Sequence, residues 1–529
     1  MNQAFVLSNP ASDNQASSVP KETFFQFIWR NKINRRYLLI ALVGTIIQFV
    51  IFKFLYPFAD FFSDSTSYIF AAQANLDINI WPIGYSKFLR IFHFISYSDT
   101  ALVAFQYFFL EIASLYLFYT ILYFIGLHRI SRTVLFIFLF FNPLFLYLSN
   151  YVNSDPLFAG FSLVWFSELL WIIYKPAAYQ VFTQAILLFL CFTIRNNAYY
   201  YPLIAIVAFL LSNQKVRIKI LGIILPFLLI MPFVIHTRNE AYKLTGTKQF
   251  SLFTGWQLAN NALYMFEYTD SAEGLSPQCQ ELDRDVRKFY NTTAPEFHAS
   301  LYNYVGNFFI RDPYSPLRKY VYKHFNITKI NTDSVVLVAW AKSSVVFKEY
   351  GEHLIKRNIQ GYMWGYLKLN AENYFLPPLE KLEIYNTGSS HVYQIIKNWF
   401  HYKSDRVTSV SNKLQGNILF LYPTLFLVLN FCFPAILLAC WLQGRYKLIA
   451  PALKKSLSVV VLLLVVNAIF CISATIIVFR YEFFPLILFF AFTLTGLELL
   501  SEKSVTDIKG NAEIDNQNYP RQELASVSH

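Results

Sequence analysis

Four ionisable residues that flank long apolar runs are the residues of this sequence best placed for chemistry: Asp64, Asp155, Arg195 and Arg480. A charge at membrane depth is costly, so such residues are candidates for function. A carboxylate can accept the proton of an attacking hydroxyl group. A guanidinium group can bind phosphate oxygens in pairs. Two carboxylates and two guanidiniums at one membrane face therefore predict a site for an anionic, lipid-linked substrate.

Each of these residues also has a structural interpretation. Asp64 stands between two serines, and Asp and Ser are preferred N-cap residues. Asp155 precedes a proline, which is a common start of a helix. Arg195 and Arg480 can extend from helix ends toward lipid headgroups, and Glu482 can neutralise Arg480 in a plain ion pair. The residues alone leave these alternatives open.

The elements that must position these residues are membrane spans. The chain of 529 residues is 55% hydrophobic and 14% charged, with a mean hydropathy of +0.38, whereas a soluble protein carries about 25% charged residues. We predict an all-α polytopic membrane protein with about ten transmembrane helices of roughly 20 residues each. We expect these spans at 37–55, 100–126, 133–149, 156–174, 179–194, 197–212, 218–236, 416–442, 456–478 and 481–500.

Basic residues set the predicted orientation. Short basic clusters precede the first span and follow the second, fourth, sixth and eighth, and with these spans they all fall on one side. The positive-inside rule assigns that side to the cytoplasm. The predicted division is a cytoplasmic N-terminal tail at 1–36, a transmembrane module at 37–236 with a first outer loop at 56–99, a mainly helical periplasmic or luminal domain at 237–415, a second transmembrane module at 416–500 and a disordered cytoplasmic tail at 501–529.

The remaining features narrow the cofactors and partners. The net charge of +12 is spread over short clusters between apolar runs, so we expect a lipid bilayer and no nucleic acid as partner. The five cysteines show no disulfide or zinc spacing. There is no P-loop, no glycine-rich dinucleotide turn and no metal-binding histidine pair, so no cofactor is predicted. The first apolar run is too long for a cleaved signal peptide and is expected to be a signal-anchor.

Five short segments within 37–262 and 416–500 occur in a recognisable order. They are Asp64-Ser65 with Tyr68 and Pro82-Ile83-Gly84-Tyr85; Ser154-Asp155-Pro156-Leu157; Arg195 at the head of a span; Arg238-Asn239, Gly246, Ser251, Gly255-Trp256-Gln257-Leu258 and Asn260-Asn261; and Arg480-Tyr481 with Pro485. In this order the chain resembles the GT-C superfamily of membrane glycosyltransferases. The resemblance is to the branch with protein O-mannosyltransferases and lipid A aminoarabinose transferases.

This resemblance implies a polyprenyl-phosphate sugar donor and a lipid, glycan or protein acceptor on the non-cytoplasmic face. It implies Asp64 as the catalytic base of an inverting transfer, with Asp155 orienting the acceptor or Asp64. Where the family often has a second acid, this chain has Ser65. This departure weakens a carried-over metal role, so a divalent metal stays possible but is not supported by the sequence. The donor phosphate is then expected at Arg195, Arg480 and Tyr481, and the sugar or acceptor at Tyr68, Tyr85, Arg238, Trp256 and Asn260.

Other classes remain open at this point. A transporter or flippase would use the same charged residues as a substrate path, but transporters favour repeats, broken spans and charges near the midplane. A polysaccharide polymerase or ligase with a large outer loop is a second alternative, and a non-catalytic assembly protein is a third. The missing cleaved signal and missing loop disulfides favour the bacterial inner membrane over the endoplasmic reticulum.

Overall fold

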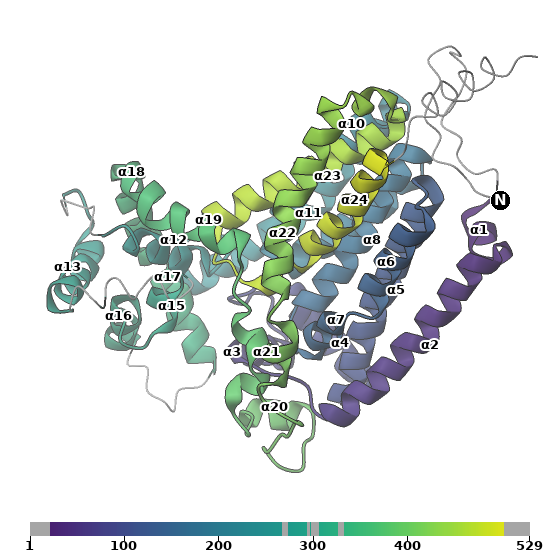
Figure 1. The fold of residues 1–529 in the computed structure, drawn as a ribbon. Coiled ribbons are helices and arrows are strands. Elements are labelled where there is room, and N and C mark those ends of the chain that lie inside the picture. Colours follow the sequence, from purple (N-terminus) through teal and green to yellow (C-terminus); the bar gives the residue numbers. More distant parts are fainter. Residues whose placement is uncertain (1–21, 267–272, 294–296, 298–305, 326–332, 502–529) are drawn as a thin grey trace, which may run out of the picture.

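The computed structural model describes residues 22–266, 273–293, 297, 306–325 and 333–501, and the chain in these ranges is mostly helical (Figure 1). No β-strand forms there, and the extended contacts are two isolated bridges, Asp60 with Tyr151 and His391 with Arg406. The predicted all-α fold is confirmed. Residues 1–21 of the predicted N-terminal tail and 502–529 of the predicted disordered tail lie outside the described residues.

Within the described ranges, eight helical segments are long and apolar enough to cross a membrane, as predicted for a multi-pass membrane protein. In lipid, backbone polar groups must bond within the segment itself, so long apolar runs become helices. The segments are α2 (Lys32–Leu55), α5 (Asp99–Phe124), α6 with α7 (Arg129–Phe140, Pro143–Asn150), α8 (Asp155–Tyr174), α11 (Val216–Thr245), α21 with α22 (Leu414–Leu419, Tyr422–Leu442), α23 (Pro451–Ala474) and η8 with α24 (Phe479–Glu482, Phe483–Ser501).

Two of the predicted spans are shorter helices. They are α9 (Gln180–Ile194) and η1 with α10 (Asn196–Tyr200, Tyr201–Leu211). The 15 residues of α9 cover about 22 Å, less than a hydrocarbon layer of about 30 Å. The turn between α9 and η1 carries Arg195. Because α9 is shorter than α11, the 30-residue helix against which it packs, this turn does not reach as far across the bundle as the C-terminal end of α11.

Burial separates the centre of the bundle from its rim. In α8 and α24, 78% of the most apolar stretch is buried, whereas in α2 and α11 only 17% is. The exposed side chains of α2 include Leu39, Val43 and Ile47, which is the pattern of a helix facing lipid. Asp155 and Arg480 thus begin the two most enclosed spans.

A break divides the predicted third span into α6 and α7. Asn142 caps α7, since its side chain accepts a hydrogen bond of 3.0 Å from the Leu144 amide. Pro143 follows at the first position of α7, where the missing N–H is harmless, but it cannot continue the preceding helix. The Asn-Pro pair therefore ends one helix and starts the next.

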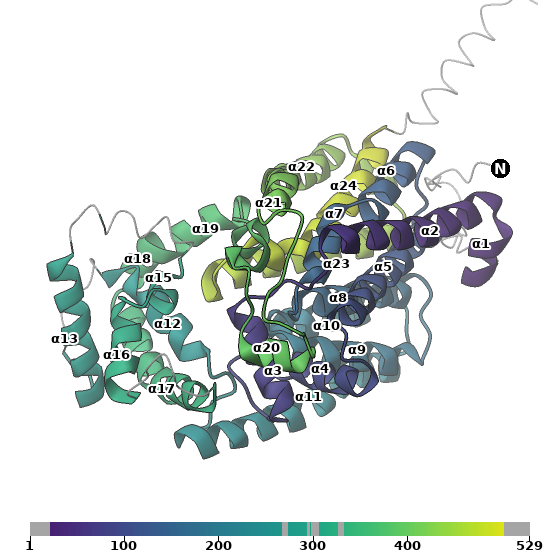
Figure 2. The same cartoon turned by 90° about the horizontal axis from the view of Figure 1, so that it is seen from below.

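Between α11 and α21 the chain forms a helical body at one end of the bundle, which we call the cap (Thr254–Trp399; Figures 1 and 2). Its core includes Trp256, Leu263, Phe347 and Tyr350. The cap contains α12 (Thr254–Leu263), α13 (Pro277–Thr292), α15 (Phe308–Arg311), α16 (Pro316–Phe325), α17 (Asp333–Arg357), α18 (Ile359–Tyr362), η4 (Met363–Leu367), α19 (Lys368–Phe375), η5 (Glu380–Glu383), η6 (Tyr385–Gly388) and α20 (Gln394–Trp399).

Three helices precede or follow the first span. α1 (Phe24–Arg30) leads into α2, and α3 (Ser63–Gln73) and α4 (Gly84–Ile95) fill the predicted loop 56–99. α4 buries Tyr85 and Leu89 but exposes Phe94 and Ile95, as a helix at a membrane surface does. α11 continues to Thr245, beyond the predicted boundary at 236.

Candidate functional site

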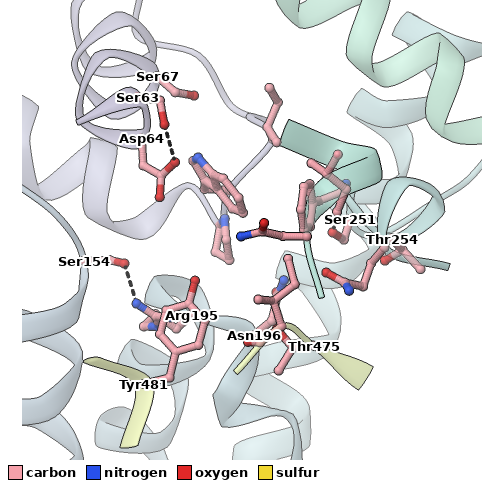
Figure 3. A pocket seen from close by; sticks show the side chains of 18 of the residues that line it. Ser63, Asp64, Ser67, Ser154, Arg195, Asn196, Ser251, Thr254, Thr475 and Tyr481 are labelled. Atoms are coloured by element: carbon pink, nitrogen blue, oxygen red, sulfur yellow. Dashed lines mark hydrogen bonds between the residues drawn. The ribbon is translucent and has the colours of Figure 1, made fainter. Parts of the chain in front are cut away.

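A cavity of about 760 Å³ lies where the cap meets the bundle. In Figure 3, Asp64, Arg195 and Tyr481 line it on one side, and Ser251 and Thr254 line it on the other. Basic groups outnumber acidic ones, which gives the cavity a positive field suited to an anion. The charged lining residues are Arg195, Arg311, Arg318, Lys381, Arg480, Asp64 and Glu380.

Asp64 lies in the first turn of α3, where the positive end of the helix dipole favours a carboxylate. It does not cap the helix: the N-cap residue is Phe62, whose amide donates to Ser65 Oγ. The Asp64 carboxylate accepts a hydrogen bond from Ser63, and its Oδ2 lies 3.7 Å from both Lys381 Nζ and Arg480 Nη2. The capping interpretation of Asp64 is therefore wrong, and the side chain is available in the cavity.

Asp155 lies behind the arginines and not in the wall of the large cavity. It is the first residue of α8, and Ser154 in the N-cap position makes no side-chain cap bond. Asp155 Oδ1 pairs with Arg195 Nη1, and its Oδ2 lies 2.9 Å from Arg480 Nη1. Asn153 Nδ2 adds a hydrogen bond of 2.6 Å. A side chain so enclosed is suited to holding both guanidiniums in place.

Tyr481 stands between the two arginines. The guanidinium carbons of Arg195 and Arg480 lie 4.4 Å and 4.7 Å from the centre of its ring. Arg480 Nη2 also donates to the Tyr481 hydroxyl at 3.1 Å. Cation–π contacts of this kind hold like charges near one another at reduced cost. Arg195, Arg480 and Tyr481, predicted as one phosphate site, are thus brought together by the fold.

A short extended contact sets the two carboxylate-bearing segments side by side. Asp60, just before α3, and Tyr151, just before α8, form a parallel bridge. The Asp60 amide donates to the Asn150 carbonyl at 2.8 Å, and the Val152 amide donates to the Asp60 carbonyl at 3.1 Å. Because each segment then enters its helix within a few residues, the bridge fixes Asp64 relative to Asp155.

The cap contributes charges that the sequence did not single out. Lys381 lies beside Asp64, and Glu380 accepts a hydrogen bond of 2.9 Å from Arg311. Burial lowers the pKa of the Lys381 ammonium, and the attraction of Asp64 opposes this shift. The Phe479 amide donates to the Pro378 carbonyl at 2.9 Å, so the segment before Lys381 also anchors the turn of Arg480. No local motif marks Arg311, Glu380 or Lys381. All three lie between 263 and 415, where the chain does not resemble the GT-C superfamily.

Tyr68 and Tyr85, the two tyrosines predicted to contact the sugar or acceptor, lie one behind the other. Tyr68 lines the cavity, and its hydroxyl lies 3.0 Å from Ser154 Oγ. Tyr85 is fully buried behind Tyr68, with ring centres 4.9 Å apart, and its hydroxyl donates to Gln106 Oε1 at 2.7 Å. Only Tyr68 is therefore placed to touch a ligand.

The other three predicted sugar or acceptor residues lie outside the lining. Trp256 is fully buried and stacks on Trp340 with 3.9 Å between ring centres. Asn260 is fully buried, and its Nδ2 donates to the Gly306 carbonyl. Arg238 is exposed on α11. The residues of α12 that line the cavity are instead Thr254, Gln257, Leu258 and Asn261.

Neutral hydrogen-bonding groups form much of the remaining wall. The side chains of Asn196, Asn197 and Asn307 line the cavity and make no hydrogen bond to any other residue in the described ranges. Asn307 is only 7% exposed. Trp81 and Phe253, with ring centres 4.8 Å apart, add an aromatic surface to the same wall.

No group of three or more His, Cys, Asp or Glu side chains that could hold a metal occurs in the described part of the chain. In comparison with known proteins, no family model, no curated protein and no solved structure matches the chain. The function is therefore inferred from the site and from the motif order.

Proposed function

We propose that this protein is an integral membrane glycosyltransferase that moves a sugar from a polyprenyl-phosphate donor to a lipid, glycan or protein acceptor. The observation that carries the proposal is that Asp64 reaches the cavity beside Arg480, which Asp155 holds from behind. A carboxylate next to guanidiniums supplies a base for the acceptor hydroxyl and a counter-charge for a departing phosphate. The order of segments that resembles the GT-C superfamily supports the same reaction.

In the proposed reaction, an acceptor hydroxyl oxygen attacks the anomeric carbon of the donor sugar. Its proton passes to the Asp64 carboxylate, and the new C–O bond forms with inversion. The bond from the anomeric carbon to the phosphate oxygen breaks, and its electron pair stays on the polyprenyl phosphate. The sugar carbon is oxocarbenium-like at the transition state.

The basic residues oppose the charge that develops on the departing phosphate. Arg195 and Arg480 provide planar donors at a fixed spacing, because Asp155 and Tyr481 hold them. Lys381 adds a third cation next to Asp64. Asp155 acts here as a positioning residue, since the arginines separate it from the cavity.

The neutral wall supports a carbohydrate as ligand. Asparagine amides both donate and accept hydrogen bonds, which suits the paired hydroxyls of a sugar. Asn196 and Asn197 directly follow Arg195, and Asn307 lies in the cap. The aromatic surface of Trp81 and Phe253 suits the apolar face of a sugar ring.

The proposal includes the orientation predicted from the basic clusters. Lys32, Arg129, Lys175, Lys215 and Lys447 all lie at or beside the span ends remote from Asp64 along their helices. This distribution supports a cytoplasmic side opposite the cap. We therefore place the cap on the periplasmic side of a bacterial inner membrane, with both termini cytoplasmic.

The test is sugar transfer by the purified protein in detergent, from a panel of labelled polyprenyl-phosphate sugars to a lipid and glycan extract of the host envelope and to Ser/Thr peptides. We expect Asp64→Asn to lower the transfer rate by at least about 100-fold, because the base is lost. Binding of polyprenyl phosphate is measured in parallel, to show that the variant is folded. Asp77→Asn is the matched control, because Asp77 forms an exposed pair with Lys87 nearby.

Transfer that survives in Asp64→Asn would remove Asp64 as the base. No transfer by the wild type with any donor, together with accelerated movement of the labelled lipid between leaflets, would favour the flippase alternative. Loss of transfer in Asp77→Asn as well would mean that the assay reports stability and not chemistry.

A further inference from the structure

α18, η4 and α19 form one continuous helical rod from Ile359 to Phe375. In Figures 1 and 2, α19 lies beside the bundle and α18 extends sideways from it. Side chains four residues apart lie in rows along this rod, because positions i and i+4 share a face of an α-helix. The single π-helical turn of η4 shifts these rows only slightly. One row carries hydrogen-bonding side chains, the second is apolar, and the third mixes polar side chains with a tryptophan.

The first row faces the end of α23. Tyr362 donates to the Ser473 carbonyl at 2.9 Å, and Tyr366 donates to the Thr475 carbonyl at 3.3 Å. Asn370 Nδ2 donates to the Thr475 carbonyl at 2.8 Å and to that of Ile472 at 3.1 Å. The last carbonyls of a helix have no partner within it. The rod therefore supplies the missing donors to α23 and is fixed to the bundle by this row.

The second row is apolar throughout. It consists of Ile359, Met363, Leu367, Ala371 and Phe375. Its two ends are exposed, and in its middle Leu367 is half-buried against the core of the cap. Ile359, Met363 and Phe375 are 63%, 54% and 38% exposed. Trp364, in the adjoining row, and Leu376, directly after α19, are 61% and 50% exposed. An apolar stripe of this length on one helix does not belong in water.

The adjoining row mixes polar side chains with a tryptophan and forms the boundary between the apolar and the polar face of the rod. It consists of Gln360, Trp364, Lys368 and Glu372, all of which are exposed. Tryptophan and lysine at the boundary between an apolar and a polar face are typical of a helix at the level of lipid headgroups.

The apolar row continues onto the surface of a membrane span. Phe375 stacks on Phe431 with 5.5 Å between ring centres. Phe431 lies in α22 and is itself 61% exposed, so it faces lipid. The apolar surface of the rod and the lipid-facing surface of the bundle are thus one surface.

We infer that the rod Ile359–Phe375 lies in the bilayer interface at the cap end of the bundle, with its apolar row among the acyl chains of the outer lipid layer there. The partner is the lipid bilayer, and neither a second copy of the chain nor another protein covers the row. The rod thereby brings Ser473 and Thr475, which line the cavity, to the lipid boundary. The inference does not depend on glycosyl transfer.

The test uses a fluorescent label at Met363→Cys and, as control, at Tyr314→Cys, which is 74% exposed on the cap away from the rod. Both variants carry Cys432→Ala, because Cys432 is half-buried while the other four cysteines are buried. The full chain is placed in nanodiscs of dibrominated phosphatidylcholine, and iodide is the aqueous quencher. We expect the bromolipid to quench the label at 363 and iodide to quench it about fivefold less than the label at 314.

A label at 363 that iodide reaches as readily as the label at 314 would overturn the inference. A label shielded from both quenchers would also overturn it, because protein would then cover the row. If the cysteine variant does not fold, intrinsic tryptophan fluorescence of the wild type and of Trp364→Phe tests the same inference. Bromolipid should quench a smaller fraction of the fluorescence in Trp364→Phe, because the variant lacks a tryptophan placed at the lipid boundary. Equal quenching in the two proteins would contradict the inference.

Discussion

Arg480 Nη1 lies 2.9 Å from Asp155 Oδ2, although 325 positions separate the two residues in the sequence. Asp155 begins α8 and Arg480 precedes α24, so this pair joins the two most enclosed spans at their cap ends. Arg480 also lies 3.7 Å from Asp64 Oδ2. The guanidinium therefore links the enclosed carboxylate to the one in the cavity, and the position of the proposed base depends on the packing of the bundle.

The enclosed carboxylate gives the first prediction. Asp155→Asn removes the charge that faces both Arg195 and Arg480. Arg195 then loses its carboxylate partner, and Arg480 keeps only the longer contacts to Asp64 and Glu380. We expect the free energy of unfolding to fall by about 3–5 kcal/mol, as for other broken buried pairs. Thermal and denaturant unfolding in detergent measure this. Asp77→Asn breaks an exposed pair with Lys87 and is expected to change stability by less than about 1 kcal/mol. Equal losses in the two variants would contradict the structural role of Asp155.

The paired arginines give the second prediction. Arg195→Lys keeps the charge but replaces a planar donor that Tyr481 stacks against. We expect polyprenyl phosphate to bind about tenfold more weakly, a loss of about 1.4 kcal/mol, because a lysine lacks the rigid pair of parallel donors with which arginine binds two phosphate oxygens. Calorimetry or thermophoresis measures the affinity. Arg238→Lys is the control, because Arg238 is exposed outside the cavity. A similar loss in that control would show that binding follows surface charge and not the site.

The span ends explain what the sequence could predict. Apolar runs mark where helices begin and end, so Asp64, Asp155, Arg195 and Arg480 could be assigned to neighbouring ends from their positions alone. The choice between helix faces could not be made in the same way. In α12, Trp256 and Asn260 share one face while Gln257 and Asn261 share the next, and each face carries at least one amide that could bind a sugar. Which face meets the cavity is decided by α17, which packs against α12 from elsewhere in the chain.

The same limit applies to Lys381 and Arg311. Both lie in the cap, in a part of the sequence with neither a motif nor a hydrophobic period that points to the site. Lys381 reaches Asp64 because the segment around Pro378 is held against the turn of Arg480. A contact between residues so far apart in the chain is a property of the tertiary fold. No local pattern carries it.

Asp60 gives a prediction on pH. Burial raises the pKa of its carboxyl from 3.8 to about 7, and the hydrogen bond from the Asn386 amide lowers it in part. A folded-state pKa above the unfolded value means that the folded protein holds this proton more tightly. The stabilisation is therefore full below the unfolded pKa and is lost as pH rises through about 7.

We expect the stability of the wild type, relative to Asp60→Asn, to fall by about 2–3 kcal/mol between about pH 5 and about pH 8. The amide of the variant does not titrate, so the difference between the two melting curves isolates Asp60 from other groups. A difference that stays constant over this range, or that grows in favour of the wild type at high pH, would contradict the assignment.

The contact between α12 and α17 gives the last prediction. A Cβ at Gly255 would lie 1.8 Å from the Ser344 carbonyl oxygen, which is backbone and cannot rotate away. Gly255→Ala must therefore push α12 off α17, and an overpacked contact of this kind costs about 1–3 kcal/mol or more. Gln257 and Asn261 move with α12, so the cap should open to protease before the bundle melts. Gly44→Ala is the matched control, because its Cβ would meet only side chains, the ring of Phe141 at 3.1 Å and the end of Gln48 at 3.9 Å. Alanine also favours a helix over glycine by about 1 kcal/mol, so this control should keep or gain stability. If the cap of Gly255→Ala resists protease as well as that of the control, α12 and α17 do not pack as closely as the structure has them.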